Sequence, residues 1–160
     1  HLLQLLAENN NGCDNQGWIP ERIFLFGYGS GACLAMETCR RLQAIGHPPL
    51  GGSICVSGGC SMDAKATVKA NTKSTTTVAA TPVLLMTGSK DTTMFPPDKA
   101  RESASAYNKH TNGAKTAHNN VQLHIEPNKG QGMISTPSEM KIIMGFLATK
   151  LVRMSKMHPS

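Results

Sequence analysis

A glycine-rich turn between a short apolar run and a helical pattern is the feature that most constrains the fold. Residues 22–26 (RIFLF) are rich in strand formers, and residues 27–32 (GYGSGA) follow them directly. Over residues 30–45 apolar side chains recur at helical spacing, and Gly46 is a helix stop signal. A strand, a tight turn and a helix in this order predict one unit of a parallel sheet whose strands are connected by helices.

The remaining apolar segments continue the alternation of strands and helices. A polar, Thr-rich stretch over residues 58–80 predicts an exposed loop or excursion. The whole pattern indicates the α/β class, with a mostly parallel sheet, helices on both faces, and ligand-binding loops beyond the carboxyl ends of the strands. The expected strands are residues 53–57, 82–87 and 121–126, and the expected helices are residues 2–8, 97–108 and 137–154.

Length and charge set limits on the class of protein. The 160 residues fit one domain or part of one. No apolar run approaches the ~18–20 residues of a membrane span, so we expect a soluble, cytoplasmic protein without a membrane span. The net charge of +6 comes from dispersed basic residues without interleaved aromatic ones, and we therefore expect no nucleic-acid partner.

Cysteine and histidine spacing predicts no metal site and no bound cofactor. None of the five cysteines forms a C-x-x-C pair, and His110, His118 and His124 lack complementary ligand spacing. Reduced thiols in a cytosol-like compartment are the simpler interpretation.

Two different sites use a glycine-rich turn between a strand and a helix. As G-x-G-x-x-A, residues 27–32 match a dinucleotide fingerprint, but Ser57 and Gly58 follow the next strand, where that fingerprint requires an acidic residue. As G-x-S-x-G, the turn matches a nucleophile elbow with Gly27 and Gly31 in the flanking positions and Gly29 at the centre. We favour the elbow.

Four segments of the chain resemble, in order, the α/β hydrolases of the phospholipase/carboxylesterase family, which includes acyl-protein thioesterases and lysophospholipase-like enzymes. The segments are RIFLFGYGSGACLAMETC (22–39), LGGSICVSGGC (50–60), TPVLLMTGSKD (81–91) and IEPNKGQGMIS (125–135). The resemblance implies an α/β-hydrolase fold and hydrolysis of carboxylic esters or thioesters. Because the chain starts at His1 inside a helical pattern, it also implies that residues 1–160 are a C-terminal part of such a domain, with the N-terminal strands missing.

The resemblance also implies that the catalytic triad is degenerate. The family's nucleophilic Ser matches Gly29, its acid matches Asp91 and its His matches Gln131. Gly has no nucleophile and Gln does not titrate, so only the acid position is retained. Loss of one triad member alone costs ~10⁴–10⁶-fold in turnover.

Neighbouring residues offer limited replacements. Ser30 could be a displaced nucleophile or supply an oxyanion N–H, but Tyr28 would then crowd the turn, and we favour Ser30 as the cap of the following helix. His124 alternates with Leu123 and Ile125 within a strand, which favours a structural role.

Three functions remain open at the level of sequence. The first is a catalytically impaired or inactive family member that has an acyl ester or thioester as its possible ligand. The second is an active esterase that uses Ser30. The third is a non-enzymatic acyl-binding, lipid-binding or protein-interaction module that uses the Met-rich final helix, although we expect Met140 and Met144 to pack against the sheet beside Ile143 and Leu147. The sequence does not indicate the oligomeric state.

Overall fold

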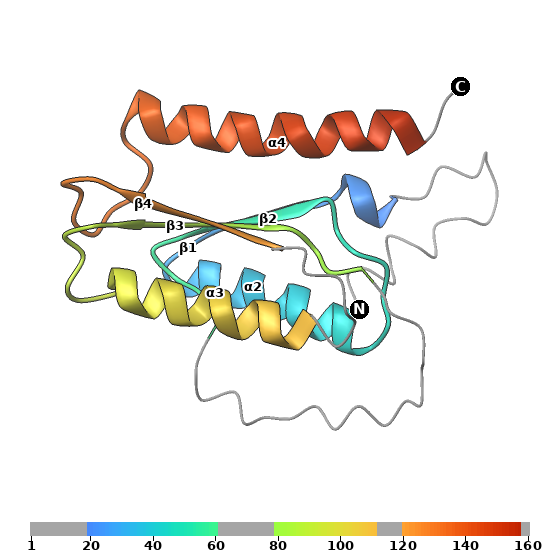
Figure 1. Cartoon of the computed structure of the whole chain (residues 1–160), viewed down its shortest axis with the longest axis horizontal. Helices are drawn as coiled ribbons and strands as arrows, with labels where there is room; N and C mark the ends of the chain where they lie inside the picture. Colours follow the sequence, from blue (N-terminus) through green and yellow to red (C-terminus); the bar gives the residue numbers. More distant parts are fainter. Residues whose placement is uncertain (1–18, 61–78, 112–119, 158–160) are drawn as a thin grey trace.

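The computed structural model describes residues 19–60, 79–111 and 120–157, and within them a parallel sheet forms the centre of the molecule (Figure 1). Its strands lie in the order β1-β2-β3-β4, each parallel to its neighbours. The expected helix at residues 2–8 and residues 61–78 of the expected loop lie outside the described residues. The strands are β1 (Phe24–Tyr28), β2 (Gly52–Val56), β3 (Val83–Gly88) and β4 (Val121–Glu126).

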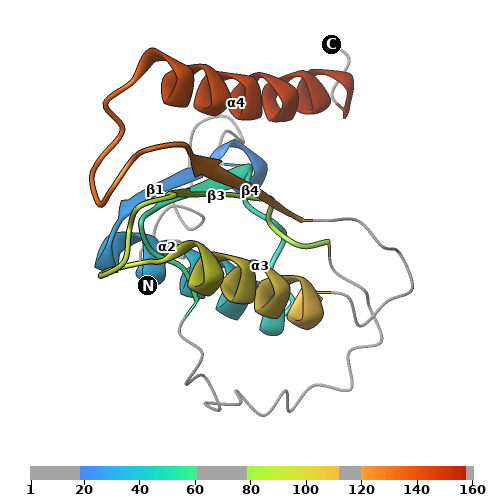
Figure 2. The same ribbon diagram turned by 60° about the vertical axis from the view of Figure 1, so that its left-hand side comes forward.

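Helices cover both faces of the sheet, as Figures 1 and 2 show. Helices α2 (Ser30–Ala44) and α3 (Pro97–Thr111) lie on one face, and α4 (Pro137–Met157) lies on the other. A short 3-10 turn, η1 (Pro20–Arg22), leads into β1. The expected α/β class, with a parallel sheet between helices, is confirmed.

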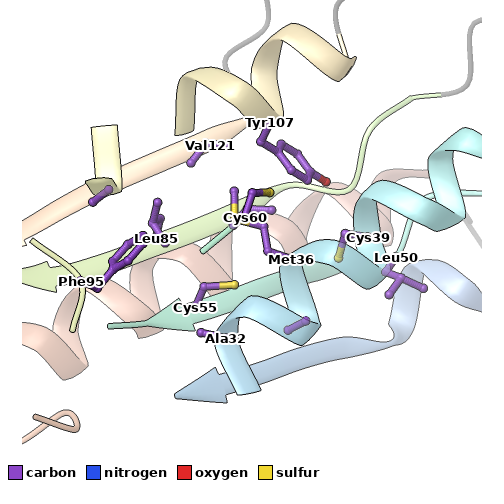
Figure 3. Packing of buried hydrophobic residues seen from close by; sticks show 13 residues of the cluster. Ala32, Met36, Cys39, Leu50, Cys55, Cys60, Leu85, Phe95, Tyr107 and Val121 are labelled. Atoms are coloured by element: carbon purple, nitrogen blue, oxygen red, sulfur yellow. The ribbon is translucent and has the colours of Figure 1, made fainter. Parts of the chain in front are cut away.

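The central position of β2 and β3 in the sheet explains why their sequences are mostly apolar. Every residue of β2 and β3 is buried, because helices cover them on both faces. Side chains of these strands alternate between two hydrophobic clusters, which Figure 3 shows for the α2 and α3 face. A fully buried Leu or Val of this kind contributes about 1.5–3 kcal/mol. The buried central strands therefore hold the loops at their carboxyl ends in fixed positions.

Helix α2 begins directly after the glycine-rich turn and ends at the expected stop signal. Gly46 has a φ of +76°, and its N–H donates to the Gln43 carbonyl, while the His47 N–H donates to the Leu42 carbonyl. These bonds satisfy carbonyls at the helix end. Glycine suits this position because it adopts the left-handed conformation at little energetic cost.

The structure corrects two expectations. Met140 and Met144 do not pack against the sheet; both are exposed, and Ile143 and Phe146 face β2 and β3 instead. The reason is rotational: the residues of α4 that meet the sheet lie on the opposite side of the helix from Met144. The stretch that begins at residue 58 is not exposed at its start, because residues 58–60 are buried against α2 and α3.

Candidate active site

The turn after β1 has the backbone of an elbow at Gly29. This residue has φ 55° and ψ −119°, a conformation that side chains rarely adopt. A Cβ at Gly27 would lie 2.3 Å from the Gly31 carbonyl oxygen, whereas a Cβ at Gly29 would meet nothing within 4 Å. Position 27 therefore requires glycine, because the backbone of Gly31 leaves no room for a Cβ atom. At position 29 the structure leaves open space where a side chain would project.

The end of β2 packs directly against this elbow. A Cβ at Gly58 would lie 2.2 Å from the Gly29 carbonyl oxygen, and the Gly29 N–H donates to the Val56 carbonyl at 2.9 Å. Ser57, which lies between Val56 and Gly58 in the chain, has a φ of +50° and is buried. The Ser57–Gly58 pair, which stands where a dinucleotide fingerprint requires an acid, is thus explained by the close approach of two backbones.

Ser30 does not cap α2, contrary to our expectation. It is the first residue inside the helix, and the N-cap position belongs to Gly29, which makes no side-chain cap bond. The tight elbow causes this shift, because helical bonds start at the Gly29 carbonyl, which accepts from Ala32 and Cys33. The Ser30 side chain is exposed on the same turn.

Asp91 follows β3 and is 2% exposed. Its Oδ1 accepts from the backbone N–H groups of Thr93 at 3.1 Å and Met94 at 3.0 Å, and its Oδ2 accepts from the Phe95 N–H at 3.3 Å. A carboxylate held by several backbone donors is well oriented and well satisfied. Asp91 therefore holds its own loop in place, whichever further role it has.

Gln131 lies on the loop between β4 and α4, which comes close to the Asp91 loop. The Thr93 hydroxyl lies 3.5 Å from both the Gln131 Oε1 and the Asp91 Oδ1. The same two loops are joined at their bases, where the Lys90 N–H donates to the Lys129 carbonyl at 2.8 Å. The structure thus brings positions 91 and 131 together across Thr93, a residue that sequence reasoning did not single out.

An ion pair between the partly exposed Lys129 and the buried Glu139 holds the Gln131 loop, which we define as residues 127–136, onto the start of α4. Lys129 Nζ pairs with Glu139 Oε1 and also donates to the Met133 carbonyl at 2.6 Å. Glu139 Oε2 accepts from the N–H groups of Ser135 at 2.9 Å and Thr136 at 3.0 Å. Burial raises the pKa of Glu139, but the hydrogen bonds from Lys129, Ser135 and Thr136 outweigh it and hold that pKa below its usual range.

Sequence reasoning also missed this pair, although part of it has a sequence signature. Thr136 and Glu139 have the spacing of a capping box, and the Glu139 N–H donates to the Thr136 Oγ1 at 3.2 Å. No local pattern links Glu139 to Lys129, which lies ten positions earlier.

Three buried thiols and His124 are further titratable groups of the described residues. Burial raises the pKa of the free thiols of Cys39 and Cys60 to about 11 and of Cys55 to about 12, so all three are protonated near neutral pH. His124 lies within β4, where its Nε2 is 2.8 Å from Glu126 Oε2. Among residues 19–60, 79–109 and 120–151, no three His, Cys, Asp or Glu side chains are placed to share a metal ion. None of the helices in the described part of the chain is both long and apolar enough to cross a bilayer.

Three solved structures share this architecture over most of the chain. A variant of SOBER1 from Arabidopsis thaliana matches with a TM-score of 0.64 and 16% identity, over 94% of this chain and 60% of its own. Esterase PE8 matches with a TM-score of 0.63 and 23% identity, over 92% of this chain and 58% of its own. Acyl-protein thioesterase 2 from Zea mays matches with a TM-score of 0.63 and 18% identity, over 94% and 62%.

These likenesses support the fold, and the chain spans only 58% to 62% of the length of the three structures. A search of curated proteins found no match. A family model described as the thioesterase domain matches residues 20–126, which include the elbow, β2, β3 and Asp91. The chain therefore belongs to the thioesterase-domain family of α/β hydrolases.

Proposed function

We propose that this chain is a thioesterase-family protein that does not turn over esters or thioesters by the Ser-His-Asp mechanism. The observation that supports this most directly is the open space at Gly29: the strained elbow is retained, but no hydroxyl projects from it. An elbow of this kind exists to expose a nucleophile. Without one, the retained acid position cannot start covalent catalysis.

The position of Gln131 supports the same proposal. Its Oε1 lies 3.5 Å from the Thr93 hydroxyl, which lies 3.5 Å from Asp91 Oδ1. In an active triad the acid would have to orient an imidazole near this place. Gln can accept and donate hydrogen bonds but cannot take a proton from a nucleophile near neutral pH. The ligand class that the family resemblance favours is an acyl ester or thioester, held at this rim without being cleaved. Free cysteines at positions 33, 39, 55 and 60 fit a reducing compartment such as the cytosol.

Hydrolysis of p-nitrophenyl acetate and labelling by a fluorophosphonate probe test the proposal. We expect the wild-type chain to match a heat-denatured sample in both assays. The Ser30→Ala variant is the matched control, because Ser30 carries the only aliphatic hydroxyl among the two residues that flank the elbow centre, Tyr28 and Ser30. Turnover or labelling that the wild type has and Ser30→Ala lacks would overturn the proposal in favour of a displaced nucleophile.

Restoring the missing groups tests the assignment of positions 29 and 131. The double variant Gly29→Ser/Gln131→His should gain fluorophosphonate labelling at position 29, and each single variant should gain far less, because nucleophile and base act as a unit. If the single variant Gly29→Ser were labelled as strongly as the double variant, the assignment of position 131 to the base would be contradicted.

A further inference from the structure

Three polar side chains meet between β4 and the start of α4. His124 Nε2 of β4 lies 2.8 Å from Glu126 Oε2, and the Ser138 hydroxyl of α4 donates to Glu126 Oε1 at 2.9 Å. Val121 and Leu123 belong to the cluster on the α2 and α3 face, so the alternate residues of β4 face α4. The side chains of His124 and Glu126 are 24% and 14% exposed. The pair thus lies in the contact between the sheet and α4.

Two hydroxyl groups extend this contact to the carboxylate that anchors the Gln131 loop. The Ser138 oxygen lies 2.9 Å from Thr136 Oγ1, and Thr136 Oγ1 lies 3.0 Å from Glu139 Oε2. Glu139 is the buried member of the ion pair that holds the loop. A continuous chain of polar contacts therefore leads from the His124 ring to the anchor of the loop.

The number of hydroxyl hydrogens allows this chain more than one arrangement. An ionised carboxylate only accepts hydrogen bonds, and each hydroxyl has one hydrogen to donate. Thr136 and Ser138 thus supply two hydrogens for three contacts: with Glu126, with each other and with Glu139. Either Ser138 donates to Glu126, or it donates to Thr136 while Thr136 donates to Glu139. The choice depends on how strongly Glu126 needs a second donor.

His124 is the group whose charge changes that need. The hydrogen bond from His124 lowers the pKa of Glu126, so this carboxyl is ionised near neutral pH and Nε2 must be the donor. Histidine gains its second ring proton between about pH 8 and pH 5. A charged ring bonds a carboxylate more strongly than a neutral ring does. The stronger bond satisfies Glu126 and releases the Ser138 hydrogen for Thr136.

The other groups that face His124 come from β3, α4 and the Gln131 loop. In the register β3 places Met86 opposite His124, and no residue of β3 is titratable. The charged residues in the described part of α4 are Glu139, Lys141 and Lys150. Glu139 is paired with Lys129 of the loop. Among these described groups, only His124 is of a type that changes charge between about pH 5 and pH 8.

We propose that His124 is a positioning residue whose charge sets how the start of α4 holds the Gln131 loop. With His124 neutral, Ser138 donates to Glu126 and ties α4 to β4. With His124 charged, Ser138 donates to Thr136 and ties the start of the helix to the loop instead. The inference rests on the proposed function in one respect, namely that the Gln131 loop borders the ligand rim. Binding at that rim then changes with pH between about 5 and 8.

Nuclear magnetic resonance of the isotope-labelled full chain tests the proposal without any ligand. The amide signals of Thr136 and Glu139 should move with a midpoint between about pH 5 and pH 8, because these N–H groups bond Glu139 Oε2 and Thr136 Oγ1. His124→Gln keeps a donor beside Glu126 but cannot titrate, so the movement should be lost. Ser138→Ala removes the hydroxyl link and should abolish the movement while the His124 ring still titrates.

His47→Gln is the matched control and should leave the movement unchanged. His47 lies directly after α2, which covers the face of the sheet opposite α4, and its Nδ1 is 2.7 Å from the Pro48 carbonyl oxygen. If His124→Gln does not fold, Glu126→Gln replaces it and should also lose the movement. Amide signals that stay fixed over this pH range, or a movement that persists in His124→Gln or in Ser138→Ala, would overturn the proposal. Because no ester or probe takes part, these outcomes are independent of whether the chain hydrolyses esters.

Discussion

Two loops form the candidate site, and they are held in place by opposite means. The elbow around Gly29 depends on missing side chains, because Cβ atoms at Gly27 and Gly58 would lie 2.3 Å and 2.2 Å from backbone oxygens. The Gln131 loop depends instead on charged side chains, because the ion pair between Lys129 and the buried Glu139 anchors it. The shape of the elbow therefore does not depend on a side chain at position 29, which fits our proposal that the family's nucleophile is absent there. The anchors of the Gln131 loop likewise lie outside position 131.

Removing the cation from the Gln131 loop should have the largest effect on stability. Lys129→Met leaves Glu139 as a buried carboxylate without its ion partner, and we expect it to lower the free energy of unfolding by about 3–5 kcal/mol. Urea denaturation measures this. The control is Arg101→Met, which breaks the exposed pair with Asp98 and should cost no more than about 1 kcal/mol. Equal losses in the two variants would mean that the Lys129–Glu139 pair does not hold the loop.

Acid should weaken the same anchor by a smaller amount, because a protonated Glu139 keeps part of its hydrogen bonding. The pKa of Glu139 is lower in the folded chain than in the unfolded one, so its contribution is fully present above the unfolded pKa of about 4.3 and is lost as the pH falls through the folded pKa. Urea denaturation of wild type and Glu139→Gln from neutral pH to about pH 3 should show the stability difference between them narrowing. A difference that stays constant over this range would contradict the pairing.

The sequence predicted the features that depend on local spacing and missed those that depend on how distant segments meet. The alternation of strands and helices and the glycine-rich elbow could be read from the sequence, because hydrophobic period and the spacing of Gly27 and Gly29 are local. The outward direction of Met144 could not, because the face that α4 turns to the sheet depends on how the preceding loop places the helix. The Lys129–Glu139 pair was missed for the same reason: only the folded loop brings the two charges together.

The smallest effect should be found at the elbow centre, and it distinguishes the two kinds of glycine there. Gly29→Ala adds a methyl group into open space and should cost only the strain of a positive φ, about 1 kcal/mol. Gly27→Ala forces a Cβ against the Gly31 carbonyl oxygen and should cost more, about 1–3 kcal/mol or above. Urea denaturation of both variants measures the difference. If Gly29→Ala were the more damaging change, the space at position 29 would be filled, and there would be no vacant nucleophile position to restore. If the order holds, the elbow tolerates a side chain at position 29, as the restoration by Gly29→Ser requires.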